Sequence, residues 1–277
     1  MSNYSPLRYP GGKANLTPYL RTIIQNLGIE HCSYFELFAG GAGAALNLLF
    51  TNVVNQVVLN DADSHIYSFW RSILEQTDEF IQLLETTPTN MESWYHQRDV
   101  YNEPQNHSML EIGFSTFFLN RCNRSGIITK AGPIGGFEQR GQYKIDCRFN
   151  KTNLIERIKN IADRRENIEI YNEDTLEFIN NHRQRLQRQD SFLYLDPPYF
   201  VKGKSLYLNY YTNKDHEELR NLMSELRGLN WMISYDDVQE IRDLYAGFNS
   251  SIHTLNYSLQ TKRSTNEFFV FSDTINP

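Results

Sequence analysis

Short runs rich in β-branched and aromatic residues alternate along this chain with longer stretches of helical periodicity. Helix-like stretches occupy residues 44–50, 175–188 and 214–227, after the first, third and fourth β-rich runs. This alternation predicts an α/β fold with a largely parallel sheet and helices on both faces, which binds ligands at the carboxyl ends of its strands. The last two runs, joined by a short connection, are expected to be antiparallel. The seven expected strands are residues 33–38, 57–60, 168–171, 192–195, 231–234, 252–257 and 268–271.

The alternation is interrupted once, between about residues 64 and 165. Helical patterns at residues 66–84 and 109–120 run there without clear strands. We therefore expect one domain of residues 1–63 and 166–277 and an inserted, mainly helical domain of residues 64–165. Part of the insertion is expected to be a turn-rich loop or hairpin, because it contains Gly126, Gly132, Pro133, Gly135, Gly136 and Gly141.

Composition narrows the class of protein. The 277 residues are 40% hydrophobic and 13% aromatic, enough to bury a core and too apolar for a disordered chain. No apolar run reaches the roughly 18 residues that cross a membrane, and the N-terminus has no secretory pattern. We therefore expect a cytoplasmic protein with no membrane partner. Three widely spaced cysteines, Cys32, Cys122 and Cys147, favour neither a disulfide framework nor a zinc site, and no metal site is expected.

Charge is unevenly distributed along the sequence. The whole chain carries a net charge of -6, but residues 121–165 carry +7 while the segments before and after carry -7 and -6. A basic island inside an acidic chain predicts one segment that contacts phosphates, although a solvated basic helix face would look the same.

A glycine-rich turn follows the first expected strand, in Phe35-Glu-Leu-Phe-Ala-Gly-Gly-Ala-Gly-Ala44. Glycines let the backbone approach a ligand closely, and the following helix N-terminus favours electron-rich groups. The second strand ends at Asp61, which is placed to bind ribose hydroxyls as in other nucleoside-binding α/β folds. A helix N-cap is the alternative role for Asp61.

The fourth strand ends in Asp196-Pro-Pro-Tyr199. Two consecutive prolines remove two N–H donors, so the Asp196 carboxylate and the neighbouring carbonyls form a surface of acceptors only. Such a surface suits an amino group. Tyr199 can stack on the attached ring, an interaction of about 1–3 kcal/mol.

Three motifs together resemble the Dam-like, D12-class DNA adenine-N6 methyltransferases. They are Asp196-Pro-Pro-Tyr199, Phe38-Ala-Gly-Gly and Arg8-Tyr-Pro-Gly-Gly-Lys13, and their order resembles that of the family over nearly the whole chain. The resemblance implies a Rossmann-like S-adenosylmethionine-dependent methyltransferase fold in which residues 64–165 form the target-recognition region. Further matches are Asn120-Arg121, Asn123-Arg-Ser-Gly126, Asp215-His216-Glu217, Arg263 and Glu267.

The resemblance also implies roles for individual residues. Asp196, Pro197 and Tyr199 are implied to be catalytic, and Asp174 to contact the adenine of the cofactor. The residues implied to surround S-adenosylmethionine are Tyr9, Lys13, Phe38, Ala39, Gly40, Gly41, Asp61, Asp174 and Asp196. The residues implied to bind DNA are Asn123, Arg124, Lys130, Arg140, Lys144 and Arg148, with Arg124 expected to read a base.

The sequence departs from the family at a few positions. Leu37 stands where the family commonly has Pro, Ala42 where it has Gly, and Tyr9 where it often has Trp. Residues 129–136 are not the hairpin sequence of the best-known members, so their DNA recognition sequence is not transferred to this chain.

The implied reaction is methyl transfer from S-adenosylmethionine to N6 of adenine in double-stranded DNA. The target base lies inside the stack, so it must flip into the Asp-Pro-Pro-Tyr pocket. Positioning and electrostatics would supply most of the catalysis. The partners expected are double-stranded DNA and a cognate restriction endonuclease system. Two alternatives are methylation of RNA or of a protein glutamine, for which Asn commonly replaces Asp196, and a catalytically idle DNA-binding module.

Overall fold

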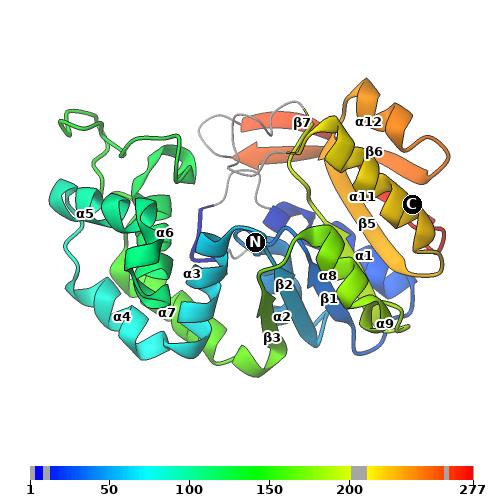
Figure 1. The fold of residues 1–277 in the computed structure, drawn as a ribbon, viewed down its shortest axis with the longest axis horizontal. Coiled ribbons are helices and arrows are strands. Elements are labelled where there is room, and N and C mark those ends of the chain that lie inside the picture. The colour runs from blue at the N-terminus through cyan, green and yellow to red at the C-terminus, as the bar shows by residue number, and fades with distance from the viewer. Residues whose placement is uncertain (1–3, 9–12, 201–210, 259–261, 277) are drawn as a thin grey trace. The chain divides into compact units, whose positions relative to one another are not determined.

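The computed structural model describes residues 4–8, 13–200, 211–258 and 262–276, with the backbone alone for residues 255–258 and 262–265. Seven strands of this described chain form one sheet in the order β3-β2-β1-β4-β5-β7-β6 (Figure 1). Each expected strand is present, which confirms the α/β class. Their bounds are β1 Ser33–Glu36, β2 Gln56–Asn60, β3 Ile168–Tyr171, β4 Ser191–Leu195, β5 Asn230–Asp236, β6 Asn249–Ser258 and β7 Lys262–Phe271.

The pairing of the strands decides which residues meet at each edge of the sheet. β1 is parallel to both β2 and β4, and β4 is parallel to β5. β7 is antiparallel to β5 and to β6, as expected for the last two strands. The carboxyl ends of β1, β2, β4 and β5 therefore lie at one edge, and the antiparallel register brings Glu267 of β7 opposite Asp236 at the end of β5.

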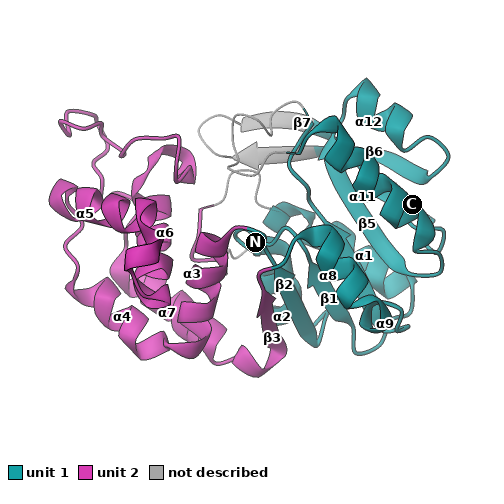
Figure 2. Cartoon of the chain, viewed as in Figure 1, with its two compact units in different colours: residues 1–3, 13–62, 173–277 teal, residues 4–12, 63–172 magenta. Residues whose placement is uncertain are grey.

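The chain divides into two compact units (Figure 2). The first comprises residues 1–3, 13–62 and 173–277, and the second comprises residues 4–12 and 63–172. The strands of the first unit bury large side chains such as Tyr34, Phe35, Trp231 and Phe269. Its helices are α1 Thr17–Asn26, α2 Gly43–Phe50, α8 Thr175–Asn181, α9 Arg183–Leu186, α11 Asn213–Glu225 and α12 Gln239–Leu244, with a 3₁₀ turn, η1, at Lys13–Leu16.

The second unit is mainly helical. Phe69, Phe80, Phe114 and Phe117 form its aromatic core, with ring centroids 5.5–6.2 Å apart. Residues 127–149 contain turns and an isolated bridge between Asn123 and Pro133, as the glycine cluster predicts. Its helices are α3 Ser64–Glu75, α4 Thr77–Thr86, α5 Met91–Asn102, α6 Met109–Cys122 and α7 Lys151–Ala162, with 3₁₀ turns η2 Pro104–Asn106, η3 Arg124–Gly126 and η4 Arg165–Asn167.

Two stretches that read as single helices are each broken in two. The 66–84 pattern is divided at Gln76, and the 175–188 pattern at His182, where the backbone leaves helical angles. The helical spacing of the buried residues continues from the first helix into the second across each break. Hydrophobic periodicity alone therefore does not reveal the two breaks. None of the helices in the described ranges is both long enough and apolar enough to span a bilayer.

Helices α3 and α6 approach closely at Gly113. A Cβ atom on this residue would lie 2.5 Å from the Ser68 carbonyl oxygen, which belongs to the backbone and has no side-chain freedom to move away. Gly113→Ala should therefore lower the free energy of unfolding by about 1–3 kcal/mol, although alanine favours a helix over glycine. Chemical denaturation measures the change. Met109→Ala, at an exposed position of the same helix, is the control and should change stability little. If Gly113→Ala is as stable as wild type, the two helices can move apart at little cost.

Candidate active site

The glycine-rich turn between β1 and α2 is pinned to the end of β2. The Gly40 N–H donates to Asp61 Oδ2 at 2.8 Å, and the Ala39 N–H donates to the Asn60 carbonyl at 3.0 Å. Asp61 thus contacts the turn directly, and the sequence was right to associate the two. The next helix, α3, is capped instead by Asp63, whose carboxylate accepts from the His65 N–H at 2.9 Å. The alternative role of Asp61 as a helix cap is therefore wrong.

The turn explains one departure from the family. Ala42 has φ +46° and ψ +37°, a left-handed conformation that glycine adopts without strain and alanine does not. Leu37, where the family commonly has proline, is buried and donates its N–H to the Tyr194 carbonyl at 3.3 Å. The chain therefore holds this turn at a small conformational cost at Ala42.

Two other expected cofactor residues flank this edge of the first unit. Asp174 caps α8, with Oδ1 accepting from the Leu176 and Glu177 N–H groups at 2.8 and 3.3 Å. Phe38 is half-buried and meets the ring of Tyr211 edge-on at 5.7 Å. Gly41 is buried in the turn. Tyr9 lies outside the described residues.

Lys13, Asp196 and Tyr199 come together beside a residue from β7. The Lys13 ammonium lies 3.3 Å from Asp196 Oδ1, 2.7 Å from the Tyr199 hydroxyl, and 2.7 and 2.8 Å from the two carboxylate oxygens of Glu267. The Tyr199 hydroxyl also donates to Glu267 Oε1 at 2.6 Å. The side chains of Lys13 and Glu267 are only 3% and 1% exposed, whereas Asp196 retains 19%. Within the cluster, Asp196 is therefore the carboxylate that can reach a ligand.

A residue of β5 also contacts Asp196. The Ser234 hydroxyl donates to Asp196 Oδ1 at 2.9 Å, so its single hydrogen is used, and the Tyr194 hydroxyl 2.7 Å away must donate to Ser234. The Phe200 N–H donates to Asp236 Oδ1 at 2.9 Å, which ties the residue after the Asp-Pro-Pro-Tyr motif to the end of β5. These contacts fix both ends of the motif to one strand.

The surroundings raise the pKa of Asp196. Burial raises it to about 6, the neighbouring Lys13 ammonium lowers it, and the negative charge of Glu267 raises it. A second carboxyl, Glu36 at the end of β1, is fully buried and accepts from the Ala45 N–H at 3.0 Å. Burial raises its pKa to about 8, and the hydrogen bond from Ala45 opposes the change.

Sequence reasoning assigned no role to Ser234 or Glu36 and gave Glu267 only as a match to the family. Ser234 and Glu36 lie near the ends of parallel strands, a signal that was available. Glu267 is in the middle of the antiparallel strand β7, and only the register against β5 places it at the same edge.

The residues expected to bind DNA differ in their surroundings. Arg124, Lys130, Arg140, Lys144 and Arg148 are all exposed, but Arg140 pairs with Glu138 at 2.9 Å and Lys144 donates to the Gln139 carbonyl. Asn123 is fully buried. Its side chain accepts from Trp94 Nε1 at 2.7 Å and donates to the Ile127 and Ile128 carbonyls.

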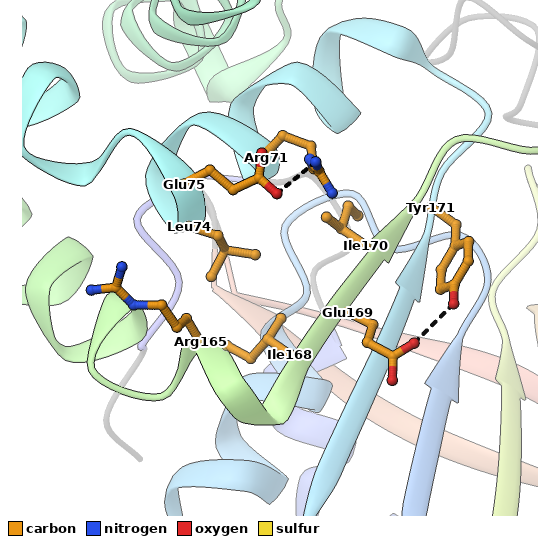
Figure 3. Close-up of a pocket in the computed structure, with 8 residues that line it drawn as sticks. All are labelled: Arg71, Leu74, Glu75, Arg165, Ile168, Glu169, Ile170 and Tyr171. Atoms are coloured by element: carbon orange, nitrogen blue, oxygen red, sulfur yellow. Dashed lines mark hydrogen bonds and ion pairs between the residues drawn. The ribbon is translucent and has the colours of Figure 1, made fainter.

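A pocket of about 380 Å³ lies in the second unit, between α3 and β3 (Figure 3). Leu74, Ile168 and Ile170 form its apolar lining. Arg71 pairs with Glu75, and the Tyr171 hydroxyl donates to Glu169 at 2.8 Å. None of Lys13, Asp196, Tyr199 and Glu267 lines this pocket, and Arg165 donates to the Ala162 carbonyl, so we do not place the active site there.

The sequence model of the family described as D12 class N6 adenine-specific DNA methyltransferase matches residues 9–259. This chain belongs to that class. Membership favours adenine methylation in DNA over the alternatives of RNA or glutamine methylation and of an idle DNA-binding module. The family implies S-adenosylmethionine as the methyl donor.

Two relatives are similar over most of their length. The Type II methyltransferase M.MjaIII of Methanocaldococcus jannaschii is 26% identical, covering 88% of each chain, and the Type II methyltransferase M1.LlaDCHI of Lactococcus lactis subsp. cremoris is 24% identical, covering 87% of this chain and 84% of that one. The solved structure of a SAM-dependent methyltransferase from Agrobacterium tumefaciens aligns with a TM-score of 0.43 and 11% identity, covering 94% of this chain and 62% of that one.

The groups at the carboxyl edge of the methyltransferase sheet fit this cofactor. S-adenosylmethionine offers ribose hydroxyls, an adenine ring, an amino acid head and a positively charged sulfonium. Carboxylates at Asp61 and Asp174 suit hydroxyl and amino donors, and the half-buried Phe38 ring suits an adenine. The surrounding acids favour a cation.

Glu36 should make the stability of the methyltransferase fall with rising pH. The unfolded chain loses this proton near its ordinary value of 4.5 while the folded chain keeps it until about pH 8, so between these values the folded state binds more protons. The free energy of unfolding then falls by at most about 1.4 kcal/mol per pH unit.

Glu36→Gln should remove this dependence, because the amide oxygen can still accept from Ala45 and carries no charge. Its melting temperature should exceed that of wild type by more at pH 8 than at pH 5. Glu225→Gln, at an exposed position, is the matched control and should follow wild type at both. An equal difference at the two pH values would mean that Glu36 is ionised in the folded protein.

Proposed function

We propose that this methyltransferase acts at a specific sequence in double-stranded DNA, on an adenine flipped into a pocket formed by Asp196, Pro197 and Tyr199. One observation carries the proposal. Asp196 Oδ1 is held by Ser234 and Lys13, whereas Oδ2 accepts no hydrogen bond from any described residue. A partly exposed carboxylate oxygen beside two residues that lack N–H donors is suited to an amino group.

Adenine N6 is a poor nucleophile because its lone pair is delocalised into the ring. Asp196 Oδ2 and the Pro197 carbonyl would accept the two N6 hydrogens and draw the nitrogen toward tetrahedral geometry. Its lone pair is then released for attack. S-adenosylmethionine supplies the methyl group on an already activated sulfonium centre, so the protein contributes mainly position and charge.

The protein must also hold the proton that N6 loses. With its pKa raised to about 6, ionised Asp196 is a stronger base than an ordinary carboxylate and is still mostly charged at neutral pH. Tyr199 supplies a ring on which the flipped base can stack, and its hydroxyl is held by Glu267.

Asp196→Ala should abolish methyl transfer, with a loss of at least about 10²-fold, while the protein stays folded. In wild type, kcat should decrease as the pH drops below about 6. A protonated Asp196 carboxyl can no longer take up the N6 proton and is a poorer hydrogen-bond acceptor. Incorporation of labelled methyl groups into duplex DNA measures both effects. Asp243→Ala, at an exposed site of the same unit, should behave as wild type; near-normal activity of Asp196→Ala would exclude Asp196 from catalysis.

The second unit, which contains the expected target-recognition region, carries an arginine cluster that supports binding to the DNA backbone. We define this cluster as Arg8, Arg121, Arg148 and Arg157. The guanidinium groups of Arg8, Arg121 and Arg157 donate to backbone carbonyls, as in the bonds from Arg8 to residues 121 and 123 and from Arg121 to residue 148. The charge of Arg148 acts on Arg8 and Arg121. None of the four pairs with a carboxylate among the described residues. Burial and then the charges of Arg8 and Arg157 lower the pKa of Arg121 to about 9, so an anion at this cluster would relieve repulsion.

Arg124 is the residue we propose to read a base. It is exposed on a turn held by the buried Asn123 and by Gly126, whose added Cβ would lie 1.9 Å from the Arg8 carbonyl oxygen. The Asn123 side chain is bonded within the unit, so we assign it to holding this turn rather than to contacting DNA. A guanidinium on a rigid turn can bind guanine through two hydrogen bonds.

Arg124→Ala should relax discrimination at one position of the target by about 1–3 kcal/mol. Arg148→Ala should instead weaken binding to all sequences and reduce the slope of log affinity against log salt by about one unit. Binding and methylation on single-base variants of the target separate the two. Arg227→Ala, which removes the same charge from an exposed site of the other unit, is the control; uniform loss with Arg124→Ala would make it a phosphate contact.

We further propose that the enzyme protects DNA from a cognate restriction endonuclease, as the Type II names of its relatives suggest. Mapping N6-methyladenine in DNA from a methylation-free host that expresses this chain would give the target sequence. Plasmid from that host should then resist endonucleases that cut the mapped site.

A further inference from the structure

The carboxylate of Glu267 is buried behind the catalytic groups. It accepts from the Lys13 ammonium through both oxygens, at 2.7 and 2.8 Å, and from the Tyr199 hydroxyl at 2.6 Å. Its side chain is 1% exposed, so it cannot itself meet the base. Both of these partners lie at the Asp-Pro-Pro-Tyr motif, since Lys13 is beside Asp196 and Tyr199 belongs to the motif.

Stability alone does not account for this buried pair. Removing two charges from water costs several kcal/mol per ion, and the attraction within the pair only offsets that cost, so a buried ion pair contributes little net stability. The Lys13–Glu267 pair is instead notable for its neighbours. The same ammonium lies 3.3 Å from Asp196 Oδ1, and the same carboxylate oxygen holds Tyr199.

We propose that Glu267 is a positioning residue for methyl transfer, which holds the Lys13 ammonium beside Asp196 and fixes the Tyr199 hydroxyl so that carboxylate and ring meet the adenine in one geometry. The inference rests on the proposed role of Asp196. Without the Glu267 charge, the Lys13 ammonium would lose its two short contacts to this carboxylate and would be drawn toward Asp196, 3.3 Å away. The acceptor oxygen would then be drawn away from N6, and Tyr199 would lose one of its anchors.

The charge of Glu267 also affects the protonation of Asp196. The groups that act on Asp196 are Lys13 from η1, Glu267 from β7, Ser234 from β5, Tyr194 from β4, and Glu36 and Tyr34 from β1. Among them Glu267 raises the pKa of Asp196 and Lys13 lowers it. Loss of the Glu267 charge therefore lowers the pKa of Asp196, and the acid limb of the pH profile for kcat moves to lower pH. Damage to packing alone would reduce kcat without moving this limb.

Glu267→Gln is the direct test, because it keeps the shape of the side chain and removes its charge. We expect kcat for methyl transfer to duplex DNA to fall roughly 10²-fold, the loss typical of a misplacement of about 1 Å. KM for DNA should change by less than about threefold, and the acid limb should move down. Calorimetric binding of S-adenosylmethionine and the melting temperature are measured alongside. Glu240→Gln, at an exposed site of the same unit, is the matched control and should equal wild type.

Three further variants extend the test, and Glu267→Asp and Lys13→Met keep it decisive if Glu267→Gln folds poorly. Glu267→Asp retains the charge on a shorter side chain and should restore at least part of the activity and the wild-type acid limb. Lys13→Met, alone and combined with Glu267→Gln, tests whether the two act together: the double variant should be no more than about threefold slower than the worse single one.

The outcomes that overturn the inference are distinct from those that overturn the proposed function. Three outcomes would each exclude a positioning role. They are a double variant whose loss of kcat is the product of the two single losses, a pH profile for kcat whose acid limb does not move, and a Glu267→Gln variant whose kcat is within about twofold of wild type. Asp196→Ala, assayed in the same series, separates the two proposals. If Asp196→Ala is active, the proposed chemistry fails; if it is inactive while Glu267→Gln is normal, only the inference about Glu267 fails.

Discussion

Parallel hydrogen bonding between β2, β1, β4 and β5 is the constraint on which the active site depends. Because these four strands run in one direction, their last residues arrive at one edge of the sheet. Glu36, Asp61 and Asp196 all lie at or just beyond such ends, although they are far apart in the sequence. The same edge therefore supplies both the glycine-rich turn and the carboxylate that we propose to meet the cofactor and the base.

The antiparallel strand β7 adds what the parallel strands cannot supply. Its register against β5 brings a carboxylate from near the chain's end to the edge where Lys13 arrives from near its start. The resulting cluster places two acids and a tyrosine hydroxyl around one ammonium, each within 3.3 Å of it. The Lys13 ammonium is needed there because it lowers the pKa of Asp196, which burial and the negative charge of Glu267 raise.

The sequence was sufficient for the class of fold and the main chemical motif, and insufficient for the contacts. All seven strands were predicted because each is a compact β-rich run bounded by turns, and Asp196 stood out because proline, acid and aromatic residues follow a strand directly. The breaks at Gln76 and His182 were missed because hydrophobic period continues through them. The burial of Asn123 and the place of Glu267 depend on partners 29 and 254 residues away, Trp94 and Lys13, which no local pattern contains.

The N-terminal segment around Arg8 is built into the second unit. Asn120 bonds both the N–H and the carbonyl of Arg8, at 2.7 and 3.0 Å, and Arg8 donates in turn to the Arg121 and Asn123 carbonyls. A segment 112 residues away in the sequence therefore supports the turn on which Arg124 lies. A substitution near the start of the chain would alter the geometry of that turn, although the two are remote in sequence.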